Sequence, residues 1–352
     1  MNNFLHNSIL YVNLEQVRQN VRTLLEELEG KALIPVLKGN AYGLGLEELG
    51  RTLAGFEEIR TLAVAQVSEG ARLRRAGISG DILVLGGVPE GLLEVGAELD
   101  LTLAVWRLGV LPRLAELGRR LGRPVKAQVK VETGLHRVGL MPGEELSALL
   151  EEWRSAAPWV EITGAFSHFA DLDDRERTEG QFQAFLAGTA QLEAGGMDIP
   201  FRHISASAAS EFFPQYRLDG VRIGRRLYMD HPTRPKGNIG EAASWRTWIT
   251  NLRDLQAGEP LGYGGHVRME RGGTVATLAV GYGDGLSPDL VRAGGPVLIG
   301  GQRARLLACC MDQTLADVTG IPCQVGDEAT FYGYDRAGNF LSAQEVSLLI
   351  GD

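Results

Sequence analysis

The stretch "LIPVLKGNAYGLG", residues 33–45, joins a short apolar run to a lysine and a glycine-rich turn. Residues 33–37 have the length and composition of a buried strand, and Lys38 follows them directly. A helical pattern begins just beyond, over 46–56, where apolar residues recur at spacings of three and four. The stretch therefore predicts a strand that ends at a lysine and leads into a helix.

This strand and helix pattern recurs along the first two thirds of the chain. Alternation of strands with helices predicts a parallel sheet, and eight such runs favour an α/β fold with a closed (β/α)8 TIM-type barrel. A doubly wound open sheet is the alternative. The expected strands are 33–37, 61–65, 81–85, 101–105, 125–131, 161–166, 202–206 and 220–224, and the helical patterns are 46–56, 67–77, 108–122, 143–156 and 180–196.

From about Ser244 the pattern changes to strands without intervening helices, separated by glycine pairs such as "IGGQ" at 299–302 that are typical of hairpin turns. We therefore predict a barrel unit over 12–235 and a mostly antiparallel β domain over 236–352. The segment "HPTRPKGN", 231–238, is the best linker. An early strand over 8–13 lies outside the count of eight and is a candidate member of the second domain.

The overall composition excludes several classes of protein. The 352 residues are 44% hydrophobic and 22% charged, which is ordinary for a globular protein. A net charge of -9 argues against a nucleic-acid partner, and we find no leader peptide and no apolar stretch long enough to cross a membrane. Three cysteines, odd in number, suit a reducing compartment, so we expect a cytoplasmic protein. The histidines and cysteines show no metal-ligand spacing.

Reactive side chains gather where the predicted strands end. The C-terminal ends of barrel strands meet at one face, where the active sites of such barrels are built. Each side chain alone has an ordinary structural explanation, such as a solvated lysine, a core histidine or a helix-capping serine. Together, an amine and anion-binding turns favour a phosphate-bearing aldehyde cofactor, pyridoxal 5′-phosphate (PLP). The residues are Lys38, Lys130, Arg137, His168, Ser207, Arg222 and Gly224.

The motifs around these residues are similar, in order, to those of the alanine racemase family, from about Ser8 to about Tyr334. The resemblance implies a PLP-dependent isomerase with a barrel and a C-terminal β domain, interconverting L- and D-forms of a small amino acid, with alanine favoured and D-alanine biosynthesis as its setting. A serine or broad-spectrum racemase is the alternative, and a non-catalytic PLP-binding protein a more remote one. The motifs are "VLKGNAYGLG" (36–45), "VKVETGLHRVG" (129–139), "GAFSHFADLD" (164–173), "VRIGRRLY" (221–228), "YGG" (263–265), "VGYGDG" (280–285) and "CMDQTLADVT" (310–319).

The resemblance implies two catalytic bases, Lys38, which also bonds the cofactor as a Schiff base, and Tyr263 of the partner subunit. Two bases are needed because racemisation removes a proton from one face of a planar centre and returns it on the other. Lysine and tyrosine ordinarily titrate near pH 10, so such a site needs cations and partial desolvation. Arg222 would face the pyridine nitrogen and leave it unprotonated, which weakens the cofactor as an electron sink.

The remaining roles also come from the resemblance. A head-to-tail homodimer with shared active sites is implied, because several of these residues, together with Tyr263, would come from the other chain. The implied cofactor ligands are Tyr42, His168, Ser207, Arg222, Gly224, Arg225 and Tyr282; the implied substrate residues are Arg137, Met311, Asp312 and Lys130, the last carbamylated in many members; and Asp173 and Asp312 would line the entrance.

The sequence departs from the family pattern at several positions. The chain stops at "SLLIGD", 347–352, short of the family's terminal segment, whose tyrosine usually contacts the phosphate. These departures favour a wider entrance and keep substrates other than alanine in consideration. The departing residues are Gly39, Leu44, Ala206, Arg225 and Ala308.

Overall fold

The computed structural model describes residues 6–231 and 234–351. Contacts within the chain define two units, one of Val17–His231 with Lys236–Ile239, and one of Met1–Gln16, Pro232–Pro235 and Gly240–Asp352. Part of the expected linker (232–233), the first five residues of the chain and the last residue of "SLLIGD" lie outside the described residues.

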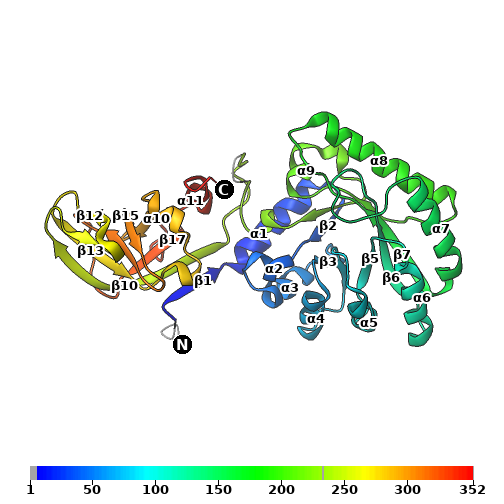
Figure 1. Cartoon of the computed structure of the whole chain (residues 1–352), viewed down its shortest axis with the longest axis horizontal. Coiled ribbons are helices and arrows are strands. Elements are labelled where there is room, and N and C mark those ends of the chain that lie inside the picture. The colour runs from blue at the N-terminus through cyan, green and yellow to red at the C-terminus, as the bar shows by residue number, and fades with distance from the viewer. Residues whose placement is uncertain (1–5, 232–233, 352) are drawn as a thin grey trace. The chain divides into compact units, whose positions relative to one another are not determined.

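The first unit is a closed parallel barrel in which the described residues supply eight strands (Figure 1). Six strands form one parallel sheet in the order β3 to β8, and β2 pairs in parallel with β9. The bridges Val36 to Ala63 and Ala206 to Arg222 join these two parts. The predicted barrel is confirmed, and the open-sheet alternative is wrong. The strands are β2 (Ala32–Pro35), β3 (Thr61–Val64), β4 (Asp81–Val84), β5 (Thr102–Val105), β6 (Val125–Lys130), β7 (Val160–Phe166), β8 (Arg202–His203) and β9 (Gly220–Ile223).

Helices cover the outside of this barrel (Figure 1). The first of them precedes the first barrel strand and packs where the chain leaves the last one, since Asn20 Nδ2 donates to the Leu227 carbonyl at 3.0 Å. The helix at 90–98 lies outside the predicted patterns. Within the described residues, no helix is both long and apolar enough to cross a membrane. The helices are α1 (Leu14–Glu27), α2 (Lys38–Tyr42), α3 (Leu46–Ala54), α4 (Val67–Arg75), α5 (Glu90–Glu98), α6 (Val110–Leu121), α7 (Glu144–Ala156), α8 (Arg175–Ala194) and α9 (Ser207–Phe212).

Polar side chains share one face of the barrel strands near their C-terminal ends. Side chains alternate along a strand, so Gln128 and Lys130 of β6 share a face while Val129 lies on the other. Both polar residues are nevertheless buried, with exposed fractions of 6% and 4%. Their burial among strands otherwise rich in valine, leucine and isoleucine indicates a site rather than a packing layer.

The second unit is a mostly antiparallel β domain, as predicted, and its sheet closes into a ring. Its strands follow the order β1-β10-β13-β16-β15-β14-β17-β18, and pairing of β10 with β17 closes the ring. The hairpin expected at "IGGQ" is present, with Gly300 and Gly301 at φ of 56° and 74°. The elements are β1 (Ser8–Val12), β10 (Ala243–Leu255), β11 (Pro260–Leu261), β12 (Val267–Arg268), β13 (Gly273–Leu278), α10 (Pro288–Arg292), β14 (Pro296–Ile299), β15 (Gln302–Cys309), β16 (Thr314–Asp317), β17 (Glu328–Tyr334), β18 (Phe340–Leu341) and α11 (Ala343–Leu348).

Close approach of two barrel strands requires a glycine in β7, which gives a test of the barrel. A Cβ at Gly164 would lie 2.2 Å from the Phe201 carbonyl oxygen, so G164A should lower the free energy of unfolding by about 2 kcal/mol or more. Gly91 in α5 has open space around a Cβ, so G91A should be neutral or stabilising by up to about 1 kcal/mol. Urea unfolding followed by circular dichroism measures both, and equal stability of the two variants would contradict the tight approach.

Candidate active site

Lys38 follows β2 and opens a turn of the opposite hand to an ordinary helix. The next four residues all have positive φ: 63° at Gly39, 57° at Asn40, 56° at Ala41 and 58° at Tyr42. Three of them carry a Cβ, and left-handed backbone costs such a residue roughly 1–2 kcal/mol. The turn after the lysine therefore stores strain that surrounding contacts must offset.

Arg222 of β9 is buried at the centre of the site and is bonded to neighbouring strand ends. Its Nη2 donates to the carbonyls of Ser167 at 2.7 Å and Ile204 at 2.9 Å, and its Nη1 donates to the His203 carbonyl at 3.1 Å. Burial, with the charge of Arg137 second, lowers the pKa of Arg222 to about 9. The guanidinium therefore remains charged at neutral pH.

His203, which the sequence analysis missed, fixes one edge of that guanidinium. Arg222 Nη1 lies 2.6 Å from His203 Nδ1, and His203 Nε2 lies 2.8 Å from Gln128 Oε1. Because the guanidinium only donates, Nδ1 must accept and Nε2 must carry the proton. Burial, followed by the charges of Arg222 and Lys130, lowers the pKa of His203 well below its usual range, so the ring is neutral. A histidine inside the expected strand 202–206 was the available signal.

His168, two residues beyond β7, is surrounded by cations. Its Nδ1 lies 3.2 Å from Arg222 Nη2. Burial lowers the pKa of His168 to about 3, and the charges of Arg222, Lys130, Arg137 and Lys38 add to the effect in that order. The predicted convergence of these residues is therefore present in the barrel unit, with His168 as a neutral imidazole among them.

Lys130 ends β6 in the buried interior. Its Nζ lies 4.8 Å from the centre of the Phe166 ring, which also lies 5.7 Å from the Arg222 guanidinium carbon. Burial, then the charges of Arg222 and Arg137, lowers the pKa of Lys130 well below its usual range, and only Glu132 opposes this. Phe166 thus presents its face to two cationic groups, a role that the sequence did not reveal.

Arg137 lies on an exposed loop shaped by Glu132. The Glu132 carboxylate accepts backbone N–H groups from Gly134 at 2.6 Å, Leu135 at 2.7 Å and Arg137 at 3.3 Å. These bonds fix the backbone of the loop, and Arg137 is an exposed residue whose charge nevertheless acts on Arg222, Lys130 and His168. Asp173 is also exposed, on the segment between β7 and α8.

The predicted phosphate residues gather beyond β8 and β9. A Cβ at Gly224 would lie 2.0 Å from the Tyr42 hydroxyl, so the absence of a side chain there lets that hydroxyl approach the backbone. Ser207 Oγ accepts the Gly224 N–H at 3.4 Å, and Arg225 follows with an exposed side chain. The N-cap of α9 is Ala206 rather than Ser207, because Ser207 already has helical geometry as the first residue. Two hydroxyls, a backbone turn and a cation match what a phosphate group requires.

The other predicted residues lie in the second unit and are exposed. Tyr263 is 85% exposed, Met311 62% and Tyr282 47%, and Asp312 is exposed as well. Tyr282 and Met311 are neighbours, since the Gly283 N–H donates to the Met311 carbonyl at 2.8 Å and the Tyr282 N–H to that of Cys310 at 3.1 Å. These turns hold aromatic and apolar side chains in solvent.

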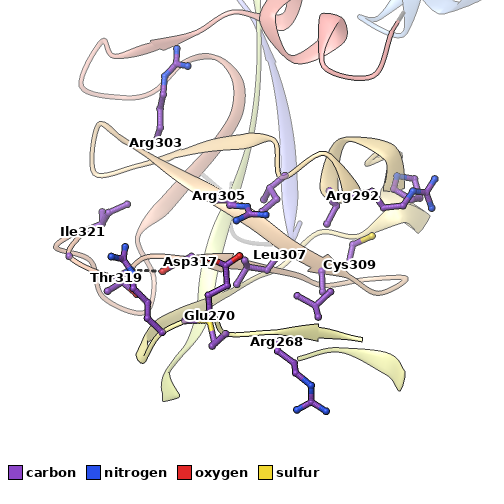
Figure 2. Close-up of a pocket in the computed structure, with 18 of the residues that line it drawn as sticks. Arg268, Glu270, Arg292, Arg303, Arg305, Leu307, Cys309, Asp317, Thr319 and Ile321 are labelled. Atoms are coloured by element: carbon purple, nitrogen blue, oxygen red, sulfur yellow. Dashed lines mark hydrogen bonds between the residues drawn. The ribbon is translucent and has the colours of Figure 1, made fainter. Parts of the chain in front are cut away.

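A cavity of about 1150 Å³ lies in this second unit (Figure 2). Several arginines line it, but Figure 2 shows Arg268, Arg292 and Arg303 pointing in different directions. Arg303 and Arg292 are already paired, with Glu345 and Asp289. The cavity is therefore not a converged anion site. In the described part of the chain, no group of three or more histidine, cysteine or acidic residues is placed to hold a metal.

Comparisons with known proteins cover both units. A family model described as alanine racemase, N-terminal domain, matches residues 12–232, and one described as alanine racemase, C-terminal domain, matches 242–351. The chain is 32% identical over 348 residues to an alanine racemase of Clostridium tetani, covering 97% of this chain and 89% of that protein. It is 33% identical over 333 residues to one of Methanococcus maripaludis, covering 92% and 88%.

Solved structures give the same result. The chain is similar to the alanine racemase of Clostridium difficile 630, with a TM-score of 0.90 and 28% identity over 99% of this chain and 92% of that one. It is also similar to the alanine racemase of Bacillus anthracis with bound L-Ala-P, with a TM-score of 0.88 and 29% identity over 99% and 91%.

The low pKa of His168 gives a pH test. The folded pKa is about 3 and the ordinary value about 6.5, so the neutral ring stabilises the fold fully above pH 6.5, and this contribution is lost as the pH falls towards 3. In the apo-protein, H168N should reduce the fall in unfolding free energy between pH 6 and 4 by up to about 1.4 kcal/mol per pH unit.

Urea unfolding at several pH values measures this slope. S205A is the control, since it removes the buried hydroxyl that donates to the Tyr216 carbonyl at 2.7 Å without removing a titrating group. S205A should lower the stability at every pH and keep the wild-type slope. A wild-type slope in H168N would mean that His168 is protonated in the folded state.

Proposed function

This chain belongs to the alanine racemase family, and on that premise we propose that it interconverts L- and D-alanine in the cytoplasm, with PLP as cofactor and with Lys38 and Tyr263 as bases. Bound PLP withdraws electrons from the Cα of an amino acid whose amino group it holds, which makes the Cα proton removable. Binding the cofactor, placing the substrate and moving that proton are then the tasks of the protein.

The residues near Gly224 fit the cofactor. Tyr42, Ser207 and the backbone of Gly224 and Arg225 would hold the phosphate, with Tyr282 of the partner subunit completing the set. The lack of a side chain at Gly224 supports this assignment, because it lets the Tyr42 hydroxyl lie close to the backbone there. Lys38 would bond the aldehyde through its amine.

The buried, hydrogen-bonded guanidinium of Arg222 is the observation that carries the proposal. Its guanidinium is buried, is bonded to three backbone carbonyls and keeps its proton at neutral pH. A donor in this position cannot protonate the pyridine nitrogen, so electron withdrawal stays moderate. Moderate withdrawal suits removal and prompt return of one proton and disfavours transfer of the amino group.

The exposure of Tyr263 supports a second base supplied across a homodimer. A tyrosine that is 85% exposed in its own chain lacks the desolvated, cation-rich surroundings that a base needs. We propose that Tyr263 of the partner subunit faces Lys38, so that each base serves one face of the substrate. The same exchange would bring Met311 and Asp312 of the partner subunit to the substrate, with Asp312 beside Asp173 at the entrance.

Arg137 and Lys130 would bind the substrate carboxylate together. Burial and the charges of Arg222 and Arg137 lower the pKa of Lys130, which raises the share of its neutral amine, the form that adds CO2 to give a carbamate and a released proton. We propose that this carbamate supplies the anion that orients Arg137, because an amine has no attraction for a guanidinium. The carbamate would also place an anion among the buried cations in place of the Lys130 amine.

A chiral assay of the purified protein with PLP and a panel of L-amino acids tests the function directly. We expect D-alanine from L-alanine, and faster conversion of serine or of many amino acids would replace alanine with that substrate class. K38A should lose both conversion and the visible absorbance of the lysine-bound cofactor. K31A alters an exposed lysine just before the same strand and should retain both. Racemisation by K38A would remove the central assignment.

The two-base arrangement predicts a directional defect. Y263F removes the hydroxyl alone, so Cα proton exchange with solvent should fall about 100-fold or more for one enantiomer and much less for the other. Measuring deuterium incorporation into L- and D-alanine separately distinguishes the two directions. Y334F changes another exposed tyrosine of the same unit and should leave both rates unchanged. Equal losses in Y263F would contradict the assignment.

A further inference from the structure

The strained turn after Lys38 is tied to α4, the helix that follows β3. The residues from Gly39 to Tyr42 all have positive φ, which is unfavourable for the three of them that carry a Cβ. Backbone bonds inside the turn, such as Gly43 N–H to the Gly39 carbonyl at 2.8 Å, close it but do not hold it against the barrel. A contact from outside the turn is therefore required.

Glu69 supplies the first contact. Its Oε1 accepts the Gly39 N–H at 2.6 Å, while its Oε2 accepts the N–H groups of Ala65 at 2.9 Å and Gln66 at 3.2 Å. The side chain is only 9% exposed, so these bonds are shielded from water. One carboxylate thus joins the residue after Lys38 to the end of β3.

Arg72, one helical turn further along α4, supplies the second contact. Its Nη2 donates to Asn40 Oδ1 at 2.7 Å and to Glu47 Oε2 at 2.8 Å, and its Nε donates to Glu47 Oε1 at 2.7 Å. Residues three apart on a helix share a face, so Glu69 and Arg72 reach the turn together. They hold two successive residues, Gly39 and Asn40.

We propose that Glu69 is a positioning residue for Lys38. The inference rests on the proposed role of that lysine, whose amine must bond the cofactor and later move a proton. Such a group must return to one place, and a displacement of about 1 Å can cost about 100-fold in rate. By fixing the peptide that follows Lys38, the Glu69 carboxylate fixes the backbone from which the Lys38 side chain extends. It thereby sets the position of the amine before and after the proton moves.

A merely structural role for Glu69 can be separated from this one. Its Oε2 caps the first turn of α4 together with Gln66, whereas the bond from Oε1 to Gly39 plays no part in that cap. Glutamine has the same shape but only one accepting oxygen. If that oxygen keeps the cap, the amide NH2 group of E69Q opposes the Gly39 N–H, donor against donor. E69Q therefore keeps the helix and releases the turn.

The test compares E69Q with E145Q in the full chain. Glu145 accepts the Met141 N–H at 2.7 Å ahead of α7, on the surface, so E145Q weakens a helix start without touching the turn. In apo-protein, amide hydrogen exchange at Gly39 should rise in E69Q alone. With PLP, E69Q should bind the cofactor about tenfold more weakly, shift the pH midpoint of its visible absorbance, and lose kcat about tenfold at nearly constant KM.

The outcomes separate this inference from the proposed function. If E69Q matches E145Q in exchange, absorbance and kcat, Glu69 is a helix cap and the positioning role is overturned. If the wild type racemises no amino acid but E69Q alone loses Gly39 protection and PLP affinity, the positioning role stands and the racemase assignment falls. Should E69Q fail to fold, E69D gives the same readouts, because its shorter side chain cannot span from the Gly39 N–H to the N–H groups of Ala65 and Gln66.

Discussion

The burial of one guanidinium constrains the rest of the site. Arg222 lies inside the barrel, and its charge is solvated chiefly by the carbonyls of Ser167, His203 and Ile204. A buried charge is tolerated only when it is fully hydrogen-bonded, so the ends of β7, β8 and β9 must stay where these carbonyls reach it. The short β8 strand is thus held in the ring by a side chain as well as by its ladder. The charge in turn disfavours every other cation nearby, and His168, His203 and Lys130 all have lowered pKa values with burial as the first cause.

Two neutral imidazoles, those of His168 and His203, beside one buried guanidinium follow from this. His203 must accept at Nδ1 and donate at Nε2, because Arg222 has no acceptor and Gln128 Oε1 has no proton. The hydrogen-bonding partners of His203, which are Arg222 and Gln128, therefore fix which of its ring nitrogens carries the proton. A carboxylate in place of Gln128 would favour an imidazolium and weaken the bond from Arg222, so an amide is the suitable partner for a neutral ring.

The sequence predicted the features that depend on pattern and topology. Eight apolar runs alternating with helices fixed the ring, and the ring brings Lys38, His168 and Arg222 to one end whatever the loops do. The left-handed turn was not predictable, because Asn40, Ala41 and Tyr42 do not prefer positive φ, and because the bonds from Gly39 to Glu69 and from Arg72 to Asn40 join segments some thirty residues apart. His203 and Phe166 were overlooked since a histidine and a phenylalanine in buried strands have ordinary packing roles. Ser207 looked like an N-cap, yet Ala206 takes that place and frees the hydroxyl to meet Gly224. In each case the missed feature depends on a contact between segments distant in sequence.

The second unit presents its predicted site residues on ordered but exposed turns. Tyr263, Tyr282 and Met311 are exposed although their side chains gain free energy from burial. Their backbones are nevertheless ordered. The Tyr282 N–H donates to the Cys310 carbonyl and the Gly283 N–H to the Met311 carbonyl, and Gly262, before Tyr263, has a φ of 64° that favours glycine. Ordered turns lower the entropy that docking would cost, and exposed aromatic side chains supply most of the free energy at protein interfaces. We therefore propose that this surface contacts a second copy of the chain, in which case the proposed second base would be carried by a unit other than the barrel that carries Lys38.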